Sequence, residues 1–281
     1  MSMNGKICMI TGANSGIGKA TAIGLAKLNA TVIMVCRDKK RGEKAREEII
    51  NQTGNKNIDL FLCDLSSQGE IRKLVSDFKE KYQNLNVLIN NAGIMLKNRS
   101  ECVDGLEMNF AVHVLAPFLL TNLLIDVLKK SAPSRVIIVD SAMHKRGRID
   151  FDDLQCENKK YSLVSAYGNS KLAELLITYE FSRRLKGTGI TVNTLHPGVV
   201  ASNLGRDQSK FSQWFARKFF KSPEEGAETS IYLASSPEVE EITGKYFANK
   251  ESRESSEKSY NREDSKRLWE ICAEITGLDI Q

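Results

Sequence analysis

A tyrosine and a lysine four residues apart could form an acid–base pair. They are Tyr167 and Lys171, in the stretch SAYGNSKLAELL. On a helix, residues at i and i+4 are neighbours, about 5–6 Å apart at Cβ. A tyrosine hydroxyl has an ordinary pKa of about 10, and a neighbouring ammonium lowers it towards the neutral range where an acid or base works well. Such a pair could exchange the hydroxyl proton when an alcohol and a carbonyl are interconverted.

Two other tyrosines also have a basic residue four positions later, so the spacing alone does not identify a site. Tyr246 and Lys250 lie on a predicted strand, where four residues span about 13 Å. Tyr179 and Arg183 share the helix of the first pair, but no strand-end serine accompanies them. Ser141 closes the apolar run RVIIVDS, and its hydroxyl could hydrogen-bond a substrate oxygen. This serine and the first pair are therefore the predicted catalytic set.

A glycine-rich turn predicts a nucleotide site. The segment ITGANSGIGKATAIGLA joins the first predicted strand to the first predicted helix. Glycine permits a positive φ and a close backbone approach, and the helix start offers unpaired N–H groups to a pyrophosphate. The residues expected to meet the cofactor here are Gly12, Asn14, Ser15, Gly16, Ile17 and Gly18.

Short apolar runs alternate with amphipathic stretches along the chain. The apolar runs read as strands covered on both faces, and the alternation predicts an α/β fold. We expect one doubly wound, mainly seven-stranded parallel sheet with helices on both faces, in a single domain over 1–281. The polar run 249–267 is predicted to be a loop before the last helix. Strands are predicted at 6–11, 31–37, 58–64, 86–91, 135–141, 190–197 and 245–249.

Composition narrows the classes of function. The net charge of +5 comes without a basic stripe, which disfavours a nucleic-acid partner. The six cysteines are scattered with no C-x-x-C, so we expect no metal site and a reducing, cytoplasmic location. We also expect no signal peptide, and no apolar run of the roughly 18 residues that a transmembrane segment needs.

Five motifs in order resemble the short-chain dehydrogenase/reductase superfamily. Within it, the chain is similar to the retinol-dehydrogenase-like group through VCRD, the long serine-to-tyrosine segment and LWEICAEITGL. The resemblance implies a Rossmann-like fold and an oxidoreductase that transfers a hydride between a nicotinamide cofactor and an alcohol/carbonyl pair. The motifs are T-G-x-x-x-G-x-G at 11–18, NNAG at 90–93, DS at 140–141, Y-x-x-x-K at 167–171 and HPGVV at 196–200.

The resemblance also implies further cofactor contacts. Lys171 would hold the nicotinamide ribose, and Asp64 would meet the adenine, although Asp64 could instead cap the next helix. Residues 1–130 would form mainly the cofactor-binding half and 131–281 the catalytic and substrate half. The other contacts implied are Leu65, Asn91, Ala92, Gly93, Tyr167, Pro197, Gly198 and Val200.

Arg37 predicts NADP(H) rather than NAD(H) as the cofactor. NAD enzymes carry an acid for the ribose 2′-OH near this point, and here Cys36 occupies the usual acid position. A guanidinium would bind a 2′-phosphate through two parallel hydrogen bonds. The alternative is a solvated arginine at the start of a charged helix.

Three positions depart from the family pattern. His113 stands where the superfamily has an asparagine that is thought to hold a water on the proton path, and Asn109 lies about one turn too early. His113 keeps a backbone carbonyl, which we favour, but its ring could relay protons itself. Asp140 replaces a serine common in the group, and Ala201 replaces a threonine that often contacts the nicotinamide amide.

Residues 203–223 are predicted to form a lid over a small, lipophilic substrate such as an aldehyde, a ketone or a retinoid-like compound. Packing on the core and shallow contact with a membrane stay open as alternatives. By resemblance, the chain could form a homodimer. A nucleotide-binding regulator without catalysis is a second functional hypothesis; it rests on His113 and Ala201, and the intact catalytic set argues against it.

Overall fold

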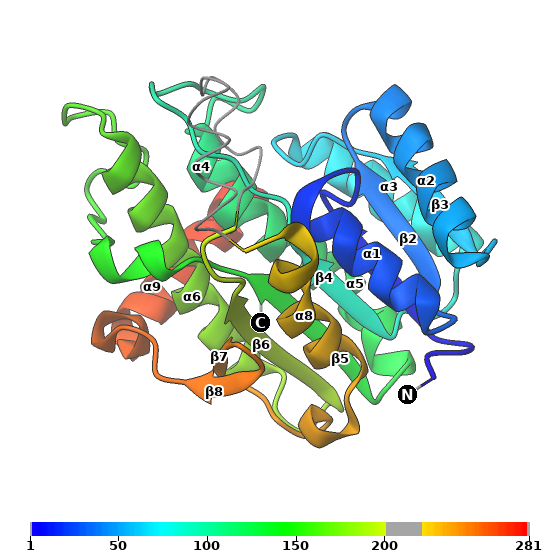
Figure 1. Cartoon of the computed structure of the whole chain (residues 1–281). Coiled ribbons are helices and arrows are strands. Elements are labelled where there is room, and N and C mark those ends of the chain that lie inside the picture. Colours follow the sequence, from blue (N-terminus) through cyan, green and yellow to red (C-terminus); the bar gives the residue numbers. More distant parts are fainter. Residues whose placement is uncertain (1, 201–220, 280–281) are drawn as a thin grey trace.

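One open sheet organises the chain. The computed structural model describes residues 2–200 and 221–279, so the predicted lid lies outside the described residues up to position 220. The strand order is β3-β2-β1-β4-β5-β6-β7-β8 (Figure 1), and the seven strands from β1 to β7 pair in parallel. The predicted doubly wound α/β class is confirmed. The strands are β1 (Ile7–Thr11), β2 (Thr31–Cys36), β3 (Ile58–Leu62), β4 (Val87–Asn90), β5 (Ser134–Val139), β6 (Ile190–His196), β7 (Tyr246–Ala248) and β8 (Glu251–Arg253).

An eighth strand corrects the prediction of a loop over 249–267. β8 pairs with β7 in the antiparallel direction. Asn249 and Lys250 join the two strands with φ of 53° and 64°, the positive values that a tight two-residue hairpin turn requires. All three residues of β8 are exposed, so no apolar alternation in the sequence could mark the strand.

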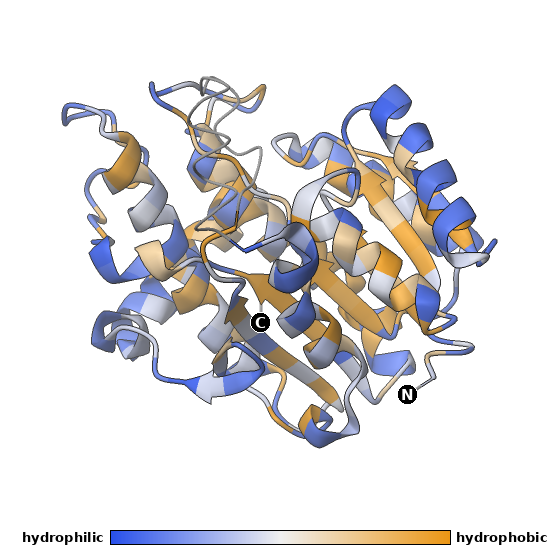
Figure 2. Cartoon of the chain, viewed as in Figure 1, coloured by the Kyte–Doolittle hydropathy of each residue, from blue (hydrophilic) through white to orange (hydrophobic). Residues whose placement is uncertain are grey.

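Helices cover both faces of the sheet, and each face has its own core. In Figure 1, α1 and α8 lie in front of the sheet. Their core contains Ile10 and Met34, whereas the core of the opposite face contains Met9 and Ile33, so neighbouring strand residues point to opposite faces. The central strands β1, β2, β4 and β5 are accordingly mostly apolar, while exposed α2 is mostly hydrophilic (Figure 2). The helices of the first face are α1 (Gly16–Lys27), α2 (Lys39–Thr53) and α8 (Pro223–Ser235); those of the second are α3 (Gln68–Lys81), α5 (Ala116–Lys130), α6 (Leu163–Arg184) and α9 (Arg262–Thr276).

A long apolar helix corrects a second prediction. The short helix α4 (Met108–Phe110), the π-helical turn η1 (Ala111–Leu115) and α5 follow one another without a break. Within the described residues, the stretch Met108–Lys130 is long and apolar enough to cross a membrane by length and composition, contrary to expectation. However, 78% of its apolar window is buried inside the protein, where Phe118 packs edge-on against Trp269 at 4.8 Å. Its apolar residues therefore belong to the core.

Candidate active site

A cavity of about 350 Å³ opens at the carboxyl ends of strands β1 to β6. The strand order reverses between β1 and β4, and such a reversal leaves a crevice where α/β sheets bind their ligands. The volume lies within the range of about 300–1,000 Å³ that is usual for small-molecule sites. The predicted residues that line it are Gly12, Asn14, Ser15, Gly16, Ile17, Gly18, Arg37, Asp64, Leu65, Asn91, Ala92, Gly93, Tyr167, Lys171 and Pro197.

The turn between β1 and α1 packs tightly against the NNAG segment. Thr11 Oγ1 accepts the N–H groups of Asn91 at 2.9 Å and Ala92 at 3.0 Å. A Cβ on Gly18 would lie 2.4 Å from both the Gly12 carbonyl oxygen and Asn91 Nδ2. Only glycine therefore fits at position 18 without movement of the backbone.

The start of α1 suits an anion such as a pyrophosphate. The N-cap residue Ser15 makes no side-chain capping hydrogen bond, and the first turn contains no acidic residue. The first N–H groups of the helix thus lack the partner that a capping side chain would supply. The residues present at this end of the cavity fit the phosphates of a dinucleotide.

The adenosine end of the cavity carries charged side chains. Arg37 Nη1 lies 3.6 Å from Asp64 Oδ2, and the Arg37 side chain is 67% exposed. Asp64 accepts hydrogen bonds from the backbone and the hydroxyl of Ser66, whereas Ser67 caps α3 by accepting from the Glu70 N–H. Asp64 is therefore not the cap of α3, which removes the alternative role considered for it.

The catalytic set comes from two neighbouring elements. Ser141 follows β5 and caps the short turn η2 (Ala142–Arg146), accepting the Met143 N–H at 3.2 Å. Tyr167 and Lys171 lie on α6, and Lys171 Nζ is 6.0 Å from the centre of the tyrosine ring. Both the catalytic and the capping interpretation of Ser141 are thus compatible with its position.

The pKa of Tyr167 is raised in this structure, although its neighbours act in the expected direction. Burial of the hydroxyl raises the pKa, and the Lys171 ammonium and the Ser141 hydroxyl lower it. Burial has the larger effect because a phenolate loses more hydration than a phenol. The expected effect of Lys171 is therefore present, but burial makes the net pKa of Tyr167 higher than its ordinary value.

Lys171 is buried and held by two acceptors. Its Nζ donates to the Val139 carbonyl at 3.0 Å and to Glu174 Oε2 at 2.6 Å. Burial lowers the pKa of Lys171, but Glu174, Tyr167 and Asp140 together outweigh that effect and the pKa is raised. The lysine is thus positively charged, and one of its three N–H groups remains for the cavity.

The His113 ring has no free nitrogen. Nε2 accepts the Ile94 N–H at 3.0 Å, and Nδ1 lies 2.8 Å from Ser170 Oγ. Since Ser170 donates its own hydrogen to the Tyr167 carbonyl, Nδ1 must be the donor to Ser170. Burial and then the Lys171 charge hold the pKa of His113 well below its usual range. The ring is neutral and fully bonded, which argues against the ring as a proton relay.

The His113 carbonyl, in contrast, cannot form the i+4 hydrogen bond of an ordinary α-helix. In an α-helix this carbonyl would accept the N–H of the residue four positions later, which here is Pro117 and has no N–H. The residue also lies in the π-helical turn η1, a distortion that is frequent at functional sites. Asn109 is occupied elsewhere, donating to Glu107 and to the Tyr161 hydroxyl.

Four of the predicted site residues do not line the cavity. Ser141, His113, Gly198 and Val200 are not among its lining residues, although Val200 pairs with Lys221 beside the undescribed segment. Most of the lining residues that were not predicted lie at or just after the end of a strand. That position in the sequence could have identified them as part of the site. They are Val35, Cys36, Asp38, Arg41, Cys63, Ile94, Val112, Val139 and Asp140.

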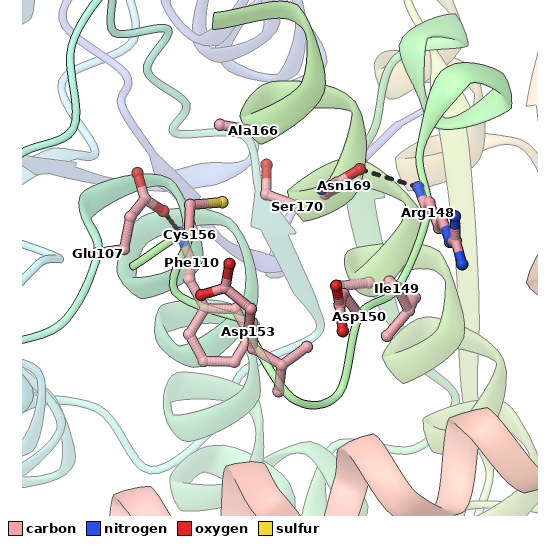
Figure 3. A pocket seen from close by; sticks show the side chains of 12 residues that line it. Glu107, Phe110, Arg148, Ile149, Asp150, Asp153, Cys156, Ala166, Asn169 and Ser170 are labelled. Atoms are coloured by element: carbon pink, nitrogen blue, oxygen red, sulfur yellow. Dashed lines mark hydrogen bonds between the residues drawn. The ribbon is translucent and has the colours of Figure 1, made fainter. Parts of the chain in front are cut away.

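A second hollow lies behind α6 and offers no ligand site. Figure 3 shows Ser170 and Asn169 on one side and Glu107 and Phe110 on the other. Its volume of about 20 Å³ has room for little more than one water, which needs about 10–15 Å³. The large cavity is therefore the candidate active site.

Comparisons with known proteins agree with this geometry. Residues 6–213 match the family model described as short chain dehydrogenase. The chain is 43% identical to human retinol dehydrogenase 14 over 98% of its own length and 88% of that protein. An uncharacterised protein from Mycobacterium paratuberculosis has a similar structure, with a TM-score of 0.81, 29% identity and coverage of 100% and 96%. The Pseudomonas aeruginosa RhlG/NADP active-site complex is also similar, with a TM-score of 0.69 and 25% identity over 88% of this chain and 95% of that one. The chain therefore belongs to the short-chain dehydrogenase family.

Proposed function

We propose that this oxidoreductase uses NADP(H) to interconvert a lipophilic alcohol and its aldehyde or ketone, with retinoid-like compounds among the candidates. The observation that carries the proposal is a single cavity lined at one end by the glycine turn and at the other by Tyr167 and Lys171. The similarity to a retinol dehydrogenase supports the substrate class. Ile94 and Val112 add apolar lining on the catalytic side.

The chain's own residues would divide the work as follows. The bound nicotinamide cofactor would supply or accept the hydride. The N–H groups at the start of α1 would hold its phosphates, and Lys171 would orient its sugar. Tyr167 gives the proton to the substrate oxygen during reduction or takes it during oxidation. Ser141 hydrogen-bonds the same oxygen and stabilises its developing charge.

Two arginines support NADP(H) as the cofactor. Arg37 and Arg41 line the cavity beside Cys36, where an acid would otherwise repel a 2′-phosphate. Among residues 2–200 and 221–279, the ion pair that Arg37 forms is the 3.6 Å contact with Asp64, and the Arg37 side chain is largely exposed. The relative RhlG was solved with NADP, which agrees with this choice.

A spectrophotometric panel tests the proposal. NADPH and NADH consumption would be followed with short and long aldehydes, ketones and retinaldehyde. We expect NADPH to be consumed faster than NADH, and long apolar carbonyl compounds to react faster than short ones. Tight NADPH binding without turnover of any compound would instead indicate the nucleotide-binding regulator.

Location and assembly complete the proposal. We place the protein in the cytoplasm, because a reducing compartment suits its six free cysteines. Contact with a membrane through the basic lid and formation of a homodimer are tested separately. Co-sedimentation with anionic vesicles addresses the first, and light scattering of the purified protein addresses the second.

A further inference from the structure

Two buried carboxyl groups lie behind Lys171, on the side away from solvent. Glu174 accepts from Lys171 Nζ at 2.6 Å, and each of these side chains is 3% exposed. Asp140, which follows β5, is also 3% exposed, and it adjoins Val139, whose carbonyl accepts from the same Lys171 Nζ at 3.0 Å. The Asp140 carboxyl also acts on the pKa of Glu174. One buried cation therefore faces two buried acids, although burial of an unpaired charge is strongly unfavourable.

Asp140 lacks a hydrogen-bond donor among the described residues. Neither of its carboxyl oxygens accepts a hydrogen bond there. His144 Nδ1 lies 3.1 Å from Asp140 Oδ2, but its hydrogen points to the Ser141 carbonyl at 2.7 Å. His144 Nε2 accepts the Ser256 N–H, so this nitrogen has no hydrogen to offer to Asp140.

A proton between the two acids resolves both problems. Two buried carboxylates beside one lysine are both acceptors, and like charges in so small a buried cluster cannot both remain ionised at little cost. One shared proton supplies the missing donor to Asp140 and makes the cluster with Lys171 neutral. Burial, together with the Asp140 carboxylate, also raises the pKa of Glu174, in keeping with a protonated acid at neutral pH.

We propose that Asp140 and Glu174 form a carboxyl pair that shares one proton and exchanges it with Lys171 during turnover. In the direction of reduction, the Tyr167 O–H bond breaks as its proton goes to the substrate oxygen. A proton from Lys171 restores the tyrosine, and Lys171 recovers one from the Glu174 carboxyl over 2.6 Å. The Asp140 carboxyl oxygens are buried, so the pair recovers its proton through Lys171, whose remaining N–H reaches the cavity and its water after the product has left.

The pair acts through Lys171 and does not touch the substrate, so both acids are positioning residues. Other titratable groups also interact with Asp140 or Glu174, and a pH profile alone would mix their effects. They are Tyr167 and Tyr179 on α6, His196 on β6 and Tyr246 on β7. The decisive measurement must therefore detect the shared proton itself.

Infrared spectroscopy of the protein without cofactor detects a protonated carboxyl group by its carbonyl-stretch band, which shifts in D₂O. The wild type should show this band at neutral pH. Glu174→Gln and Asp140→Asn should each lose it, since the remaining acid then ionises as the partner of Lys171. Both variants keep the cluster neutral, so both should fold. A wild type without the band, or a band that survives both substitutions, overturns the shared proton.

Glu180→Gln is the matched control on the same helix. Glu180 is also buried, but it pairs with Arg183 and Arg184 rather than with Lys171. This variant should keep the infrared band and the wild-type pH profile, even if its melting temperature falls. If Glu180→Gln lost the band, the protonated acid would be Glu180 and not the Asp140–Glu174 pair, and the proposal would be overturned.

Kinetics test the exchange, which rests on the proposed function. Glu174→Gln should lower kcat by roughly tenfold with little change in KM for NADPH, as groups in proton transfer contribute about 10²–10⁴-fold. Its pH–rate profile should also lose one ionisation. If kcat and the pH–rate profile of Glu174→Gln are unchanged, the proposed proton exchange with Lys171 does not occur. If the wild type reduces no carbonyl compound yet shows the band, the proposed function fails and the shared proton stands.

Discussion

At the scale of single residues, the environment of each side chain decides its chemistry. Tyr167 and Lys171 are placed as neighbours by helical spacing, but burial acts against the ammonium and leaves the tyrosine pKa raised. The hydroxyl is thus a phenol in the protein alone. It is suited to give its proton during reduction, whereas oxidation of an alcohol first requires its deprotonation.

The first prediction concerns Tyr167 as the acid. Tyr167→Phe keeps the ring, including its edge contact with His113 at 5.4 Å, and removes the proton. Turnover should fall at least about 100-fold, because acid–base groups contribute about 10²–10⁴-fold, while NADPH still binds. Initial rates and a fluorescence titration with NADPH measure the two quantities. Near-normal turnover would show that another group supplies the proton.

Arg37 is predicted to select the cofactor. Changing Cys36→Asp together with Arg37→Gln should weaken NADPH and strengthen NADH, since the new acid repels the 2′-phosphate. Loss of a hydrogen bond to a charged group costs about 1.5–3 kcal/mol. Dissociation constants for both cofactors provide the ratio. An unchanged ratio would mean that Arg37 is only a solvated side chain.

His113 is predicted to hold structure rather than to carry protons. His113→Asn places an amide N–H where Nδ1 donates to Ser170 and leaves the backbone carbonyl in place, so turnover should be largely retained, and only the Ile94 N–H loses its side-chain acceptor. His113→Ala leaves this N–H and Ser170 without their partner, which costs about 1–3 kcal/mol for a buried group. Denaturant unfolding measures the difference between the two variants. If the pH–rate profiles of both variants lost an ionisation near neutral pH, the ring would instead be the relay.

At the scale of elements, two local distortions shape the site. The turn between β1 and α1 needs glycine because the NNAG segment packs against it. The helix that starts at Met108 contains the π-helical turn η1, and Pro117 follows it. The ring of His113 accepts the Ile94 N–H, and Pro117 removes the i+4 hydrogen bond to the His113 carbonyl, which favours the carbonyl as the group that holds a water.

Gly18 provides the prediction at this scale. Gly18→Ala would press a methyl group against the Gly12 carbonyl and Asn91, each 2.4 Å from the new Cβ. Overpacking of this kind costs about 1–3 kcal/mol, and NADPH binding should weaken as the turn moves. Thermal unfolding and NADPH titration measure the two effects.

Gly54→Ala is the control for this substitution. Gly54 ends α2 with a φ of +73°, and a Cβ there would meet nothing within 4 Å. Its left-handed backbone should cost about 1–2 kcal/mol with no change in NADPH affinity. Wild-type NADPH binding by Gly18→Ala would show that the turn does not contact the cofactor.

At the scale of the whole molecule, the order of the strands assembles the site. The chain runs outwards from β1 to β3, then crosses to β4 on the other side and continues to β7. Residues from the first turn and from α6, far apart in the sequence, thereby line one cavity. The family match and the alternating apolar runs anticipated this arrangement, because parallel strands bring their carboxyl ends to the same edge of the sheet.

The sequence by itself determined the features that depend on local spacing. They include the class of fold, the glycine turn, the pairing of Tyr167 with Lys171 on one helix face, and the family. Each follows from periodicity or from the conformations that a residue type allows. The exposed strand β8 shows the limit of this reasoning, because it has no apolar alternation and its hairpin turn is not an Asn-Gly pair.

Only the tertiary structure decided the features that depend on burial and on distant partners. It set the direction of the Tyr167 pKa, gave both His113 ring nitrogens their partners, and brought Asp140 beside Glu174. Desolvation and hydrogen bonding arise from residues that are far apart in the chain and meet only when the sheet and its helices pack. No local pattern in the sequence contains that information.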